Sequence, residues 1–224
     1  MRSILVRFYF DYISPNAYVA WTQLPALARR HGVMIEPVPV LFAGLLEAAG
    51  RLAPAEIPLQ MRWMWKNVCR KAALLGIPFA RPAFHPFNPL LALRASSLPL
   101  EDEARARLID ALFAAVWARG LHVSEPDVVA RVADGIGLPG KALVAQAQEA
   151  AAKDRLRQQT ADAIAREIFG VPSMEAGDEL FWGYDDFPYL ELFLSGKDPI
   201  DPGAWQSWSV PMQPSAVRAR KAGR

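Results

Sequence analysis

The 224-residue sequence contains very little cysteine and histidine, and this scarcity excludes several classes of protein. Cys69 is its one cysteine, so an internal disulfide is impossible, and nothing places the protein outside a reducing cytosol. The three histidines are far apart and have no partner at the spacing of metal ligands. The sequence therefore predicts a cytoplasmic protein without a metal site.

Long apolar runs and a strong charge imbalance are also missing. No stretch approaches the ~18–20 apolar residues of a membrane-spanning helix, and the first residues lack the cleavage site of a signal peptide. The net charge is only +2, and four positive charges lie in the final segment VRARKAGR (217–224). We therefore expect no membrane contact, no nucleic-acid surface on the folded body, and a solvated C-terminal tail.

The apolar pattern of the first forty residues predicts two strands around one helix. Residues 4–12 are rich in β-branched and aromatic types, which is typical of a strand covered on both faces. Residues 15–30 have helical spacing. Residues 33–40 predict a second strand, and Pro37 and Pro39 favour an edge position because neither donates a backbone hydrogen bond. This order predicts a right-handed βαβ unit.

From about residue 43 to residue 168 the patterns are nearly all helical. An apolar stripe predicts one helix over 101–120. Ser124 followed three residues later by Asp127 predicts a capping box at the start of another helix. A longer helical segment that follows is expected to bend or break near 153–157.

Strand patterns return after Gly170. The segment 171–183 predicts two short strands around a turn, and a final helix is expected over 188–194. The proline-rich and glycine-rich end predicts little regular structure, with Trp205 and Trp208 packed back on the body.

These elements predict an α/β fold of the thioredoxin-like type with an inserted all-helical domain. The expected division assigns 1–42 and 165–196 to the thioredoxin-like domain and 43–164 to the inserted helical domain. An irregular C-terminal tail is expected over 197–224.

Ser14 and Pro15 mark the start of the first helix. Serine is favoured at the N-cap and proline at the first helical position, so a purely structural cap explains the pair. A helix N-terminus also stabilises negative charge, and cysteine thiols at such positions have a lowered pKa. Ser14 is therefore a candidate for holding a thiolate.

The segment GVPSM (170–174) is the second candidate. In thioredoxin-type proteins, the residue before a cis-proline presents its backbone to an extended thiol peptide beside the first helix. Val171 and Pro172 stand where the fold requires that loop. The alternative is an ordinary trans-proline at the start of a strand.

Five segments in one order carry a resemblance to a known family. The chain resembles the 2-hydroxychromene-2-carboxylate isomerases, which are related to kappa-class glutathione transferases and to DsbA oxidoreductases. The segments are FYFDYISPNAY (8–18), LLGIPF (74–79), HPFNPLLALR (85–94), IFGVPSM (168–174) and FWGYDD (181–186).

The resemblance implies glutathione as the cofactor and a homodimer. It implies that Ser14 replaces the attacking cysteine of the redox relatives, since this chain has Ser14-Pro-Asn-Ala17 where they have Cys-x-x-Cys. Disulfide exchange requires a thiolate nucleophile, so oxidoreductase activity is excluded at that position. The catalytic role implied for Ser14 is a hydrogen bond to the glutathione sulfur.

The resemblance also implies which residues bind glutathione. Val171, beside Pro172, would hydrogen-bond the cysteinyl backbone, and Asp185 would pair with the γ-glutamyl ammonium. The same end of the site would be shaped by Trp182, Gly183 and Tyr184. From local sequence alone, a solvated turn is the alternative for Asp185 and its neighbour Asp186.

Residues that contact the substrate are less defined. Arg51 and His85 are candidates, although a surface or capping role for the histidine is an equal alternative. Arg51, Lys66 and Arg81 are the candidate cations for a substrate carboxylate. Cys69 is expected to be a buried small hydrophobic residue.

The implied activity is a glutathione-dependent isomerisation of an aromatic-catabolism keto acid by reversible thiolate addition. Two alternatives remain open. One is a kappa-like glutathione transferase or peroxidase, which consumes the thiol. The other is a non-catalytic module that binds extended peptides in a thioredoxin-type cleft.

Overall fold

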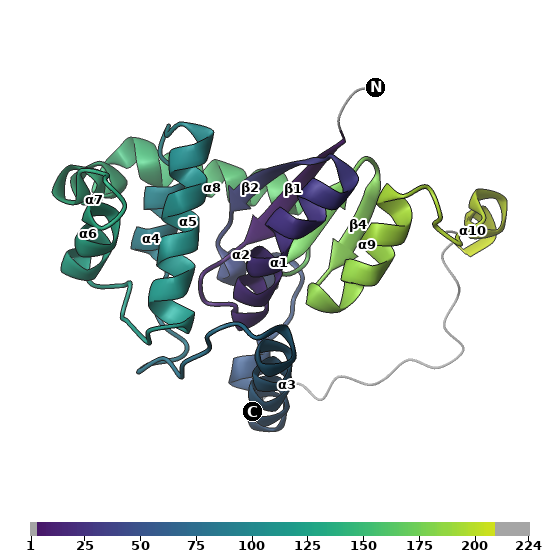
Figure 1. Ribbon diagram of the computed structural model, residues 1–224, viewed down its shortest axis with the longest axis horizontal. Helices are drawn as coiled ribbons and strands as arrows, with labels where there is room; N and C mark the ends of the chain where they lie inside the picture. The colour runs from purple at the N-terminus through teal and green to yellow at the C-terminus, as the bar shows by residue number, and fades with distance from the viewer. Residues whose placement is uncertain (1–3, 209–224) are drawn as a thin grey trace.

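The computed structural model describes residues 4–208 and contains a mixed sheet surrounded by helices (Figure 1). Within these residues the sheet has four strands in the order β2-β1-β3-β4. β1 is parallel to β2 and antiparallel to β3, and β3 is antiparallel to β4. The strands are β1 (Leu5–Phe10), β2 (Met34–Pro39), β3 (Ser173–Ala176) and β4 (Glu179–Trp182).

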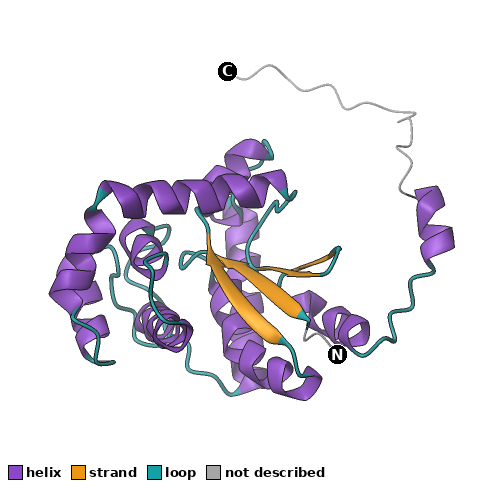
Figure 2. Ribbon diagram, turned by 90° about the horizontal axis from the view of Figure 1, so that it is seen from above, coloured by secondary structure: helices purple, strands orange, loops and turns teal. Residues whose placement is uncertain are grey.

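Helices cover both faces of the sheet (Figure 2). The helices before the β3–β4 hairpin are α1 (Pro15–His31), α2 (Phe42–Ala48), the 3-10 helix η1 (Pro54–Glu56), α3 (Pro58–Leu75), α4 (Leu90–Ser96), α5 (Asp102–Trp117), α6 (Pro126–Asp134), α7 (Gly140–Gln148) and α8 (Ala150–Ala165). After the hairpin come the 3-10 helix η2 (Tyr184–Asp186), α9 (Phe187–Leu194) and α10 (Pro202–Trp208).

This architecture confirms the α/β thioredoxin-like fold class. The predicted βαβ unit, the hairpin and the edge position of the proline-containing strand β2 are all present. The helices from α2 to α8 lie between β2 and β3 in the sequence, and Figure 1 shows α4 to α7 gathered to one side of the sheet. The proposed domain boundaries at 42–43 and 164–165 stay a prediction.

The two faces of β1 are buried against different helices. Val6, Phe8 and Phe10 are fully buried on one face, where Phe8 and Phe10 stack 5.7 Å apart. The centre of the Phe10 ring also lies 5.4 Å from that of Phe113 of α5. On the other face Tyr9 packs in a cluster with residues of α2, α8 and the 168–171 loop. The strand is therefore covered on both sides, as its apolar sequence predicts.

Local signals at both ends of α1 explain its length. Ser14 is the N-cap and Pro15 the first helical residue, while Arg29, Arg30 and His31 lie in the last turn near the negative end of the helix dipole. Gly32 ends the helix in the left-handed conformation at φ 62°.

Two helix boundaries differ from the prediction. Ser124 forms no capping box, because Pro126 begins α6 and Glu125 is its N-cap; the Ser124 hydroxyl donates to Asn88 O at 2.6 Å instead. The break in the long helical segment lies at Glu149, whose extended backbone separates α7 from α8, and not near 153–157. Ala147 and Ala152 are buried on either side of this break.

The end of the chain is more regular than predicted. Within 197–224, expected to be irregular, residues 202–208 form α10, but Trp205 and Trp208 are exposed and are not packed on the body. The basic segment 217–224 lies outside the described residues. None of the described helices is both long enough and apolar enough to cross a membrane.

Candidate functional site

Ser14 lies where β1 ends and α1 begins. Its Oγ accepts a hydrogen bond from the Ala17 amide at 3.2 Å, so it caps the helix. The same hydroxyl donates to the Val171 carbonyl at 3.4 Å, which is a long hydrogen bond. The first turn of α1 carries no acidic side chain, so the positive end of the helix dipole is not neutralised there.

The Val171–Pro172 loop lies directly beside Ser14. Its peptide bond is cis, and Val171 is 8% exposed. Apart from Ser14 Oγ, no described residue hydrogen-bonds the Val171 backbone. A backbone amide without a partner among the described residues is suited to pairing with an extended peptide.

The β3–β4 hairpin brings the 182–185 segment to the same place. Ser173 of β3 is paired with Trp182 of β4, and the Gly183 amide donates to Pro172 O at 2.9 Å. The Trp182 indole packs so closely on Gly170 that a Cβ there would lie 2.6 Å from Nε1. Glycine at 170 is therefore required for this contact.

Asp185 is held by a lysine that the sequence analysis missed. Its Oδ2 accepts a hydrogen bond from Lys71 Nζ at 2.7 Å, and the same ammonium donates to Asn16 Oδ1 at 3.1 Å. The Lys71 side chain is 11% exposed and that of Asp185 is 70% exposed. The ammonium also lies 5.9 Å from the centre of the Tyr184 ring. Lys71 thus links α3 to the start of α1 and to η2.

The neighbouring carboxylate has a different role. Asp186 Oδ2 accepts a hydrogen bond from the Trp182 amide at 2.7 Å, so it stabilises the turn that follows β4. Of the two acidic residues at this turn, Asp185 is the one whose carboxylate is held by the lysine.

Arg51 lies on the Trp182 side of the site. Its guanidinium carbon is 5.8 Å from the centres of both the Phe169 and Trp182 rings, a cation–π arrangement. The structure therefore groups Arg51 with the predicted glutathione residues, while its predicted contact with substrate stays untested. The other two candidate cations, Lys66 and Arg81, are exposed.

His85 fixes the loop that carries Ser14. Its Nε2 is 3.0 Å from the Ile13 carbonyl, which only accepts, so Nε2 carries the proton. The centre of its ring lies 5.0 Å from that of the Trp65 ring and 5.9 Å from that of the Trp117 ring. Burial lowers the pKa of His85, and the hydrogen bond to Ile13 offsets part of that effect. A neutral imidazole in this position leaves Nδ1 buried and, among the described residues, without a partner.

Asp11 is a second residue that the sequence analysis missed. It is 1% exposed, and its carboxylate accepts hydrogen bonds from the Ile13 amide at 3.0 Å and the Phe42 amide at 2.9 Å. Its backbone carbonyl accepts from the Ser14 amide at 3.1 Å. Burial raises the pKa of Asp11 to about 7, although the two backbone hydrogen bonds act in the opposite direction. The residue ties the Ser14 loop to the start of α2.

Cys69 does not belong to this site. It is exposed on α3, so the prediction that it is buried is wrong. The cause is that Cys69 lies off the buried stripe of Met64, Val68 and Ala72 on α3, a helix that Figure 1 shows projecting from the body. Among the described residues no group of histidine, cysteine and carboxylate side chains could hold a metal ion.

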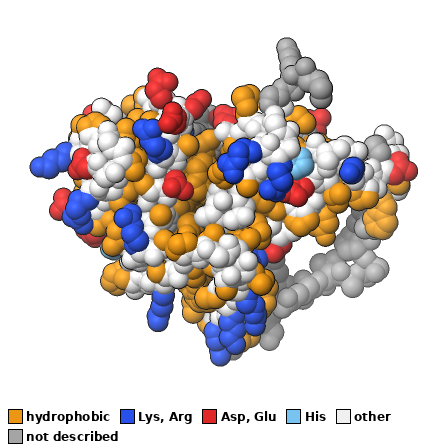
Figure 3. All heavy atoms as spheres, in the orientation of Figure 1, with side chains coloured by type: hydrophobic (Ala, Val, Ile, Leu, Met, Phe, Trp, Pro, Cys, Tyr) orange, Lys and Arg blue, Asp and Glu red, His pale blue; other side chains and the backbone are white. Residues whose placement is uncertain are grey.

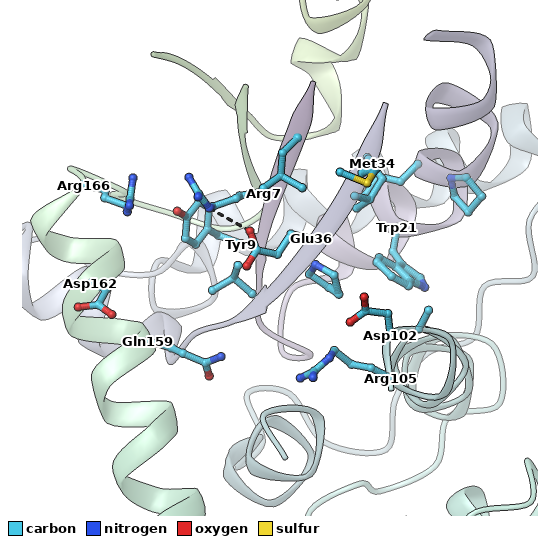
Figure 4. Close-up of a pocket in the computed structure, with 17 residues that line it drawn as sticks. Arg7, Tyr9, Trp21, Met34, Glu36, Asp102, Arg105, Gln159, Asp162 and Arg166 are labelled. Carbon is cyan, nitrogen blue, oxygen red and sulfur yellow. Dashed lines mark hydrogen bonds and ion pairs between the residues drawn. The ribbon is translucent and has the colours of Figure 1, made fainter. Parts of the chain in front are cut away.

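Two cavities lie elsewhere in the described residues, and the first of them runs along the sheet. It is a groove of about 790 Å³ along β2, between β1 and the helices α5 and α8 (Figure 4). Its lining mixes acidic and basic side chains, and Arg7 is paired with Glu36 at 3.0 Å and with Glu175 at 3.4 Å. None of the predicted site residues lines either cavity.

The arrangement is suited to holding an anionic peptide thiol. It combines a helix N-terminus, a serine hydroxyl, a Val171 amide without a partner among the described residues, and charged groups of both signs within one contiguous region. No thiol of the chain itself lies at the helix start, since residues 14–17 contain no cysteine. A reaction that needs sulfur here requires a sulfur from another molecule.

Comparisons with known proteins agree over nearly the whole chain. A model of the DSBA-like thioredoxin domain family matches residues 5–195. The 2-hydroxychromene-2-carboxylate isomerase of Sphingobium xenophagum is 32% identical over 84% of this chain and 97% of its own length. A glutathione S-transferase kappa 2 of Caenorhabditis elegans is 28% identical over 85% of this chain and 92% of its own.

A solved structure extends this similarity to three dimensions. The structure of a 2-hydroxychromene-2-carboxylate isomerase superposes with a TM-score of 0.81 at 28% identity. The superposition covers 93% of this chain and all of that one.

Proposed function

Since this chain belongs to the DSBA-like thioredoxin domain family and, within it, to the enzyme family of 2-hydroxychromene-2-carboxylate isomerases, we propose that it isomerises an aromatic-derived keto acid with glutathione as cofactor. The observation that carries the proposal is the position of Ser14. Its hydroxyl occupies the start of α1, beside the Val171 carbonyl, where redox relatives have a cysteine. Sulfur chemistry at this point depends on a thiol that the chain does not provide.

The charges of the site fit glutathione, which carries one ammonium and two carboxylates. Asp185 is the group for the ammonium, whereas Lys71 and Arg51 are the cations for the carboxylates. The backbone of Val171 would pair with the cysteinyl residue, because its amide has no other partner among the described residues. Trp182, Gly183 and Tyr184 form the wall between these groups.

Ser14 would act as a hydrogen-bond donor to sulfur. The Ala17 amide donates to its Oγ, which polarises the hydroxyl and strengthens it as a donor. The existing bond to Val171 O is long, so the hydroxyl proton is free to turn towards a nearby anion. Hydrogen bonding to the charged form of a thiol lowers its pKa.

Other side chains would keep Ser14 in place. His85 hydrogen-bonds the Ile13 carbonyl. Asp11 accepts hydrogen bonds from the Ser14 amide, through its backbone carbonyl, and from the Phe42 amide at the start of α2, through its carboxylate. When bound, glutathione would supply a thiolate nucleophile for the isomerisation without being consumed.

The first experiment measures isomerisation and the fate of glutathione together. The purified chain is incubated with 2-hydroxychromene-2-carboxylate, with and without glutathione, and both product and free thiol are quantified. We expect turnover that requires glutathione and leaves its concentration unchanged. S-methylglutathione, which has no thiol, is the control and should not support turnover.

A kappa-like glutathione transferase is the second candidate, because a kappa relative is 28% identical over most of the chain. The same experiment separates the two activities, since a transferase consumes thiol in proportion to product. The non-catalytic peptide-binding alternative is not retained, because the named relatives are enzymes.

A homodimer and a cytoplasmic location stay predictions. Light scattering coupled to size-exclusion chromatography tests the first, with a mass of twice 24.8 kDa expected.

A further inference from the structure

A cavity of about 480 Å³ lies between α2, α4 and α8, outside the site described above. Its walls are mostly apolar, with Leu41, Leu90, Leu156 and Ile164 among them. A volume of this size accommodates a small organic molecule of one or two rings.

The charged residues of this cavity all have the same sign. Arg94, Lys153 and Arg157 line it, and no acidic side chain does. Arg157 is exposed and already pairs with Asp154 at 2.6 Å, and Lys153 is exposed to solvent. An apolar cavity with an excess of positive charge is suited to an apolar anion.

Arg94 is the most enclosed of these three cations, and it has no partner among the described residues. It is only partly exposed, and its Nε is buried and makes no hydrogen bond. Within residues 4–208 no carboxylate forms an ion pair with its guanidinium. A buried guanidinium nitrogen without an acceptor is costly, and a carboxylate is the acceptor that matches guanidinium geometry.

The cavity borders the segment that carries Ser14. Its wall residue Leu41 directly precedes Phe42, whose amide donates to the Asp11 carboxylate at 2.9 Å. The Asp11 carbonyl accepts from the Ser14 amide. A ligand in the cavity is thus separated from the Ser14 loop by the first turn of α2.

We propose that this cavity binds a small aromatic carboxylate, with the carboxylate on Arg94 and the ring between Leu41, Leu90 and Ile164. This ligand is distinct from the substrate of the isomerase, since the first turn of α2 lies between the cavity and the Ser14 loop.

The test is calorimetric titration with 1-naphthoate and with its neutral analogue 1-naphthalenemethanol. Wild type is expected to bind the carboxylate at least tenfold more tightly than the alcohol, because a charged hydrogen bond contributes about a factor of ten or more. Arg94→Gln should weaken naphthoate binding at least tenfold. Arg131→Gln, on α6 outside the cavity, is the matched control and should change it less than twofold.

A second variant covers the case in which Arg94→Gln misfolds. Ala161 lines the cavity and is exposed, so Ala161→Trp fills the cavity from its rim without entering the core. It should abolish naphthoate binding and keep the wild-type circular dichroism spectrum and Tm. Equal binding of naphthoate and the alcohol, or unchanged naphthoate binding in either variant, would overturn the proposal.

Two further measurements separate this proposal from the proposed function. Arg94→Gln should bind glutathione like wild type, because Arg94 is not among the groups around Ser14. If wild type binds naphthoate but not glutathione, the proposed function fails and the cavity assignment stands. Because the cavity lies outside the Ser14 site, Arg94→Gln should also keep the KM for 2-hydroxychromene-2-carboxylate within twofold of wild type, and a larger rise would overturn the assignment of a separate carboxylate site.

Discussion

The region around Ser14 and the cavity around Arg94 differ in whether their polar side chains already have hydrogen-bond partners within the protein. At the first, polar side chains are hydrogen-bonded to the backbone. The Asp11 carboxylate accepts hydrogen bonds from two backbone amides, and His85 Nε2 donates one to the Ile13 carbonyl. At the second, the Arg94 side chain lines mostly apolar walls and has no partner among the described residues. The first region is organised before any ligand arrives, which suits a reactive centre. The second leaves its main polar group to be satisfied by the ligand, which suits recognition.

A third surface resembles neither region. Basic side chains gather over α3 (Figure 3), and Arg62, Lys66 and Arg70 are exposed there. Only Lys71, on the inner side of this helix, is bonded to the Ser14 region. Charge on the outer side of α3 is therefore separate from the site.

The largest effect is expected from Ser14→Ala. Losing the donor to sulfur should lower kcat by about 10²–10³-fold, as loss of one preorganised donor does elsewhere. The lost helix cap should cost about 1 kcal/mol of unfolding free energy. Steady-state kinetics and urea denaturation measure the two separately.

Ser14→Thr is the matched control, because it keeps both the hydroxyl and the cap. It should retain most of the activity and stability. If Ser14→Ala kept kcat within threefold of wild type, the preorganised centre would have no catalytic role.

The second effect concerns Asp11, whose buried carboxyl has a pKa of about 7. Because this value lies above that of an unfolded chain, the folded state binds the extra proton between the two values, and stability falls as pH rises through this window. From about pH 5 to about pH 8 the loss should be ~3 kcal/mol. Asp11→Asn has no such proton, so the wild-type unfolding free energy should fall relative to this variant across that range.

Urea denaturation of both proteins at the two pH values gives the comparison. A difference between them that stays constant with pH would show that Asp11 is ionised in the folded state throughout. The Ser14 loop would then be held by a charged group.

The third effect concerns glutathione affinity. Lys71→Met removes the ammonium that links Asp185 to Asn16, and we expect about tenfold weaker binding of glutathione. Lys66→Met, on the outer side of the same helix, should change the affinity less than twofold. Calorimetry on both variants makes the test, and equal effects would mean that only the overall charge of α3 matters.

The smallest effect is expected from Cys69→Ser. The thiol is exposed on α3 and has no link to Ser14, so kcat/KM should stay within about twofold of wild type, as for ordinary surface changes. A large loss would indicate that the chain's own sulfur takes part in the reaction.

What could be predicted from the sequence is mostly local. Ser14, Pro15 and Gly32 define α1 because caps and turn residues act within a few positions of themselves. The apolar character of β1 and the hairpin at 171–183 are read in the same way. The capping box at Ser124 failed because a competing local signal, Pro126, sets the start of α6 one residue later.

Contacts between distant segments could not be read from the chain. Lys71 reaches Asp185 across 114 positions, and Asp11 meets Phe42 only because β2 returns beside β1. The position of Arg94 in a cavity is visible only in the fold, where α2, α4 and α8 come together. An exposed and a partly buried arginine look alike in sequence, so these residues needed the fold.

The ionisation of bound glutathione tests the central claim most directly. Ultraviolet absorbance of the thiolate is followed as a function of pH for glutathione bound to wild type and to Ser14→Ala. The account predicts a thiol pKa well below that of free glutathione in wild type, and a return towards the free value in the variant. An unchanged thiol pKa in wild type, or equal values in the two proteins, would contradict it.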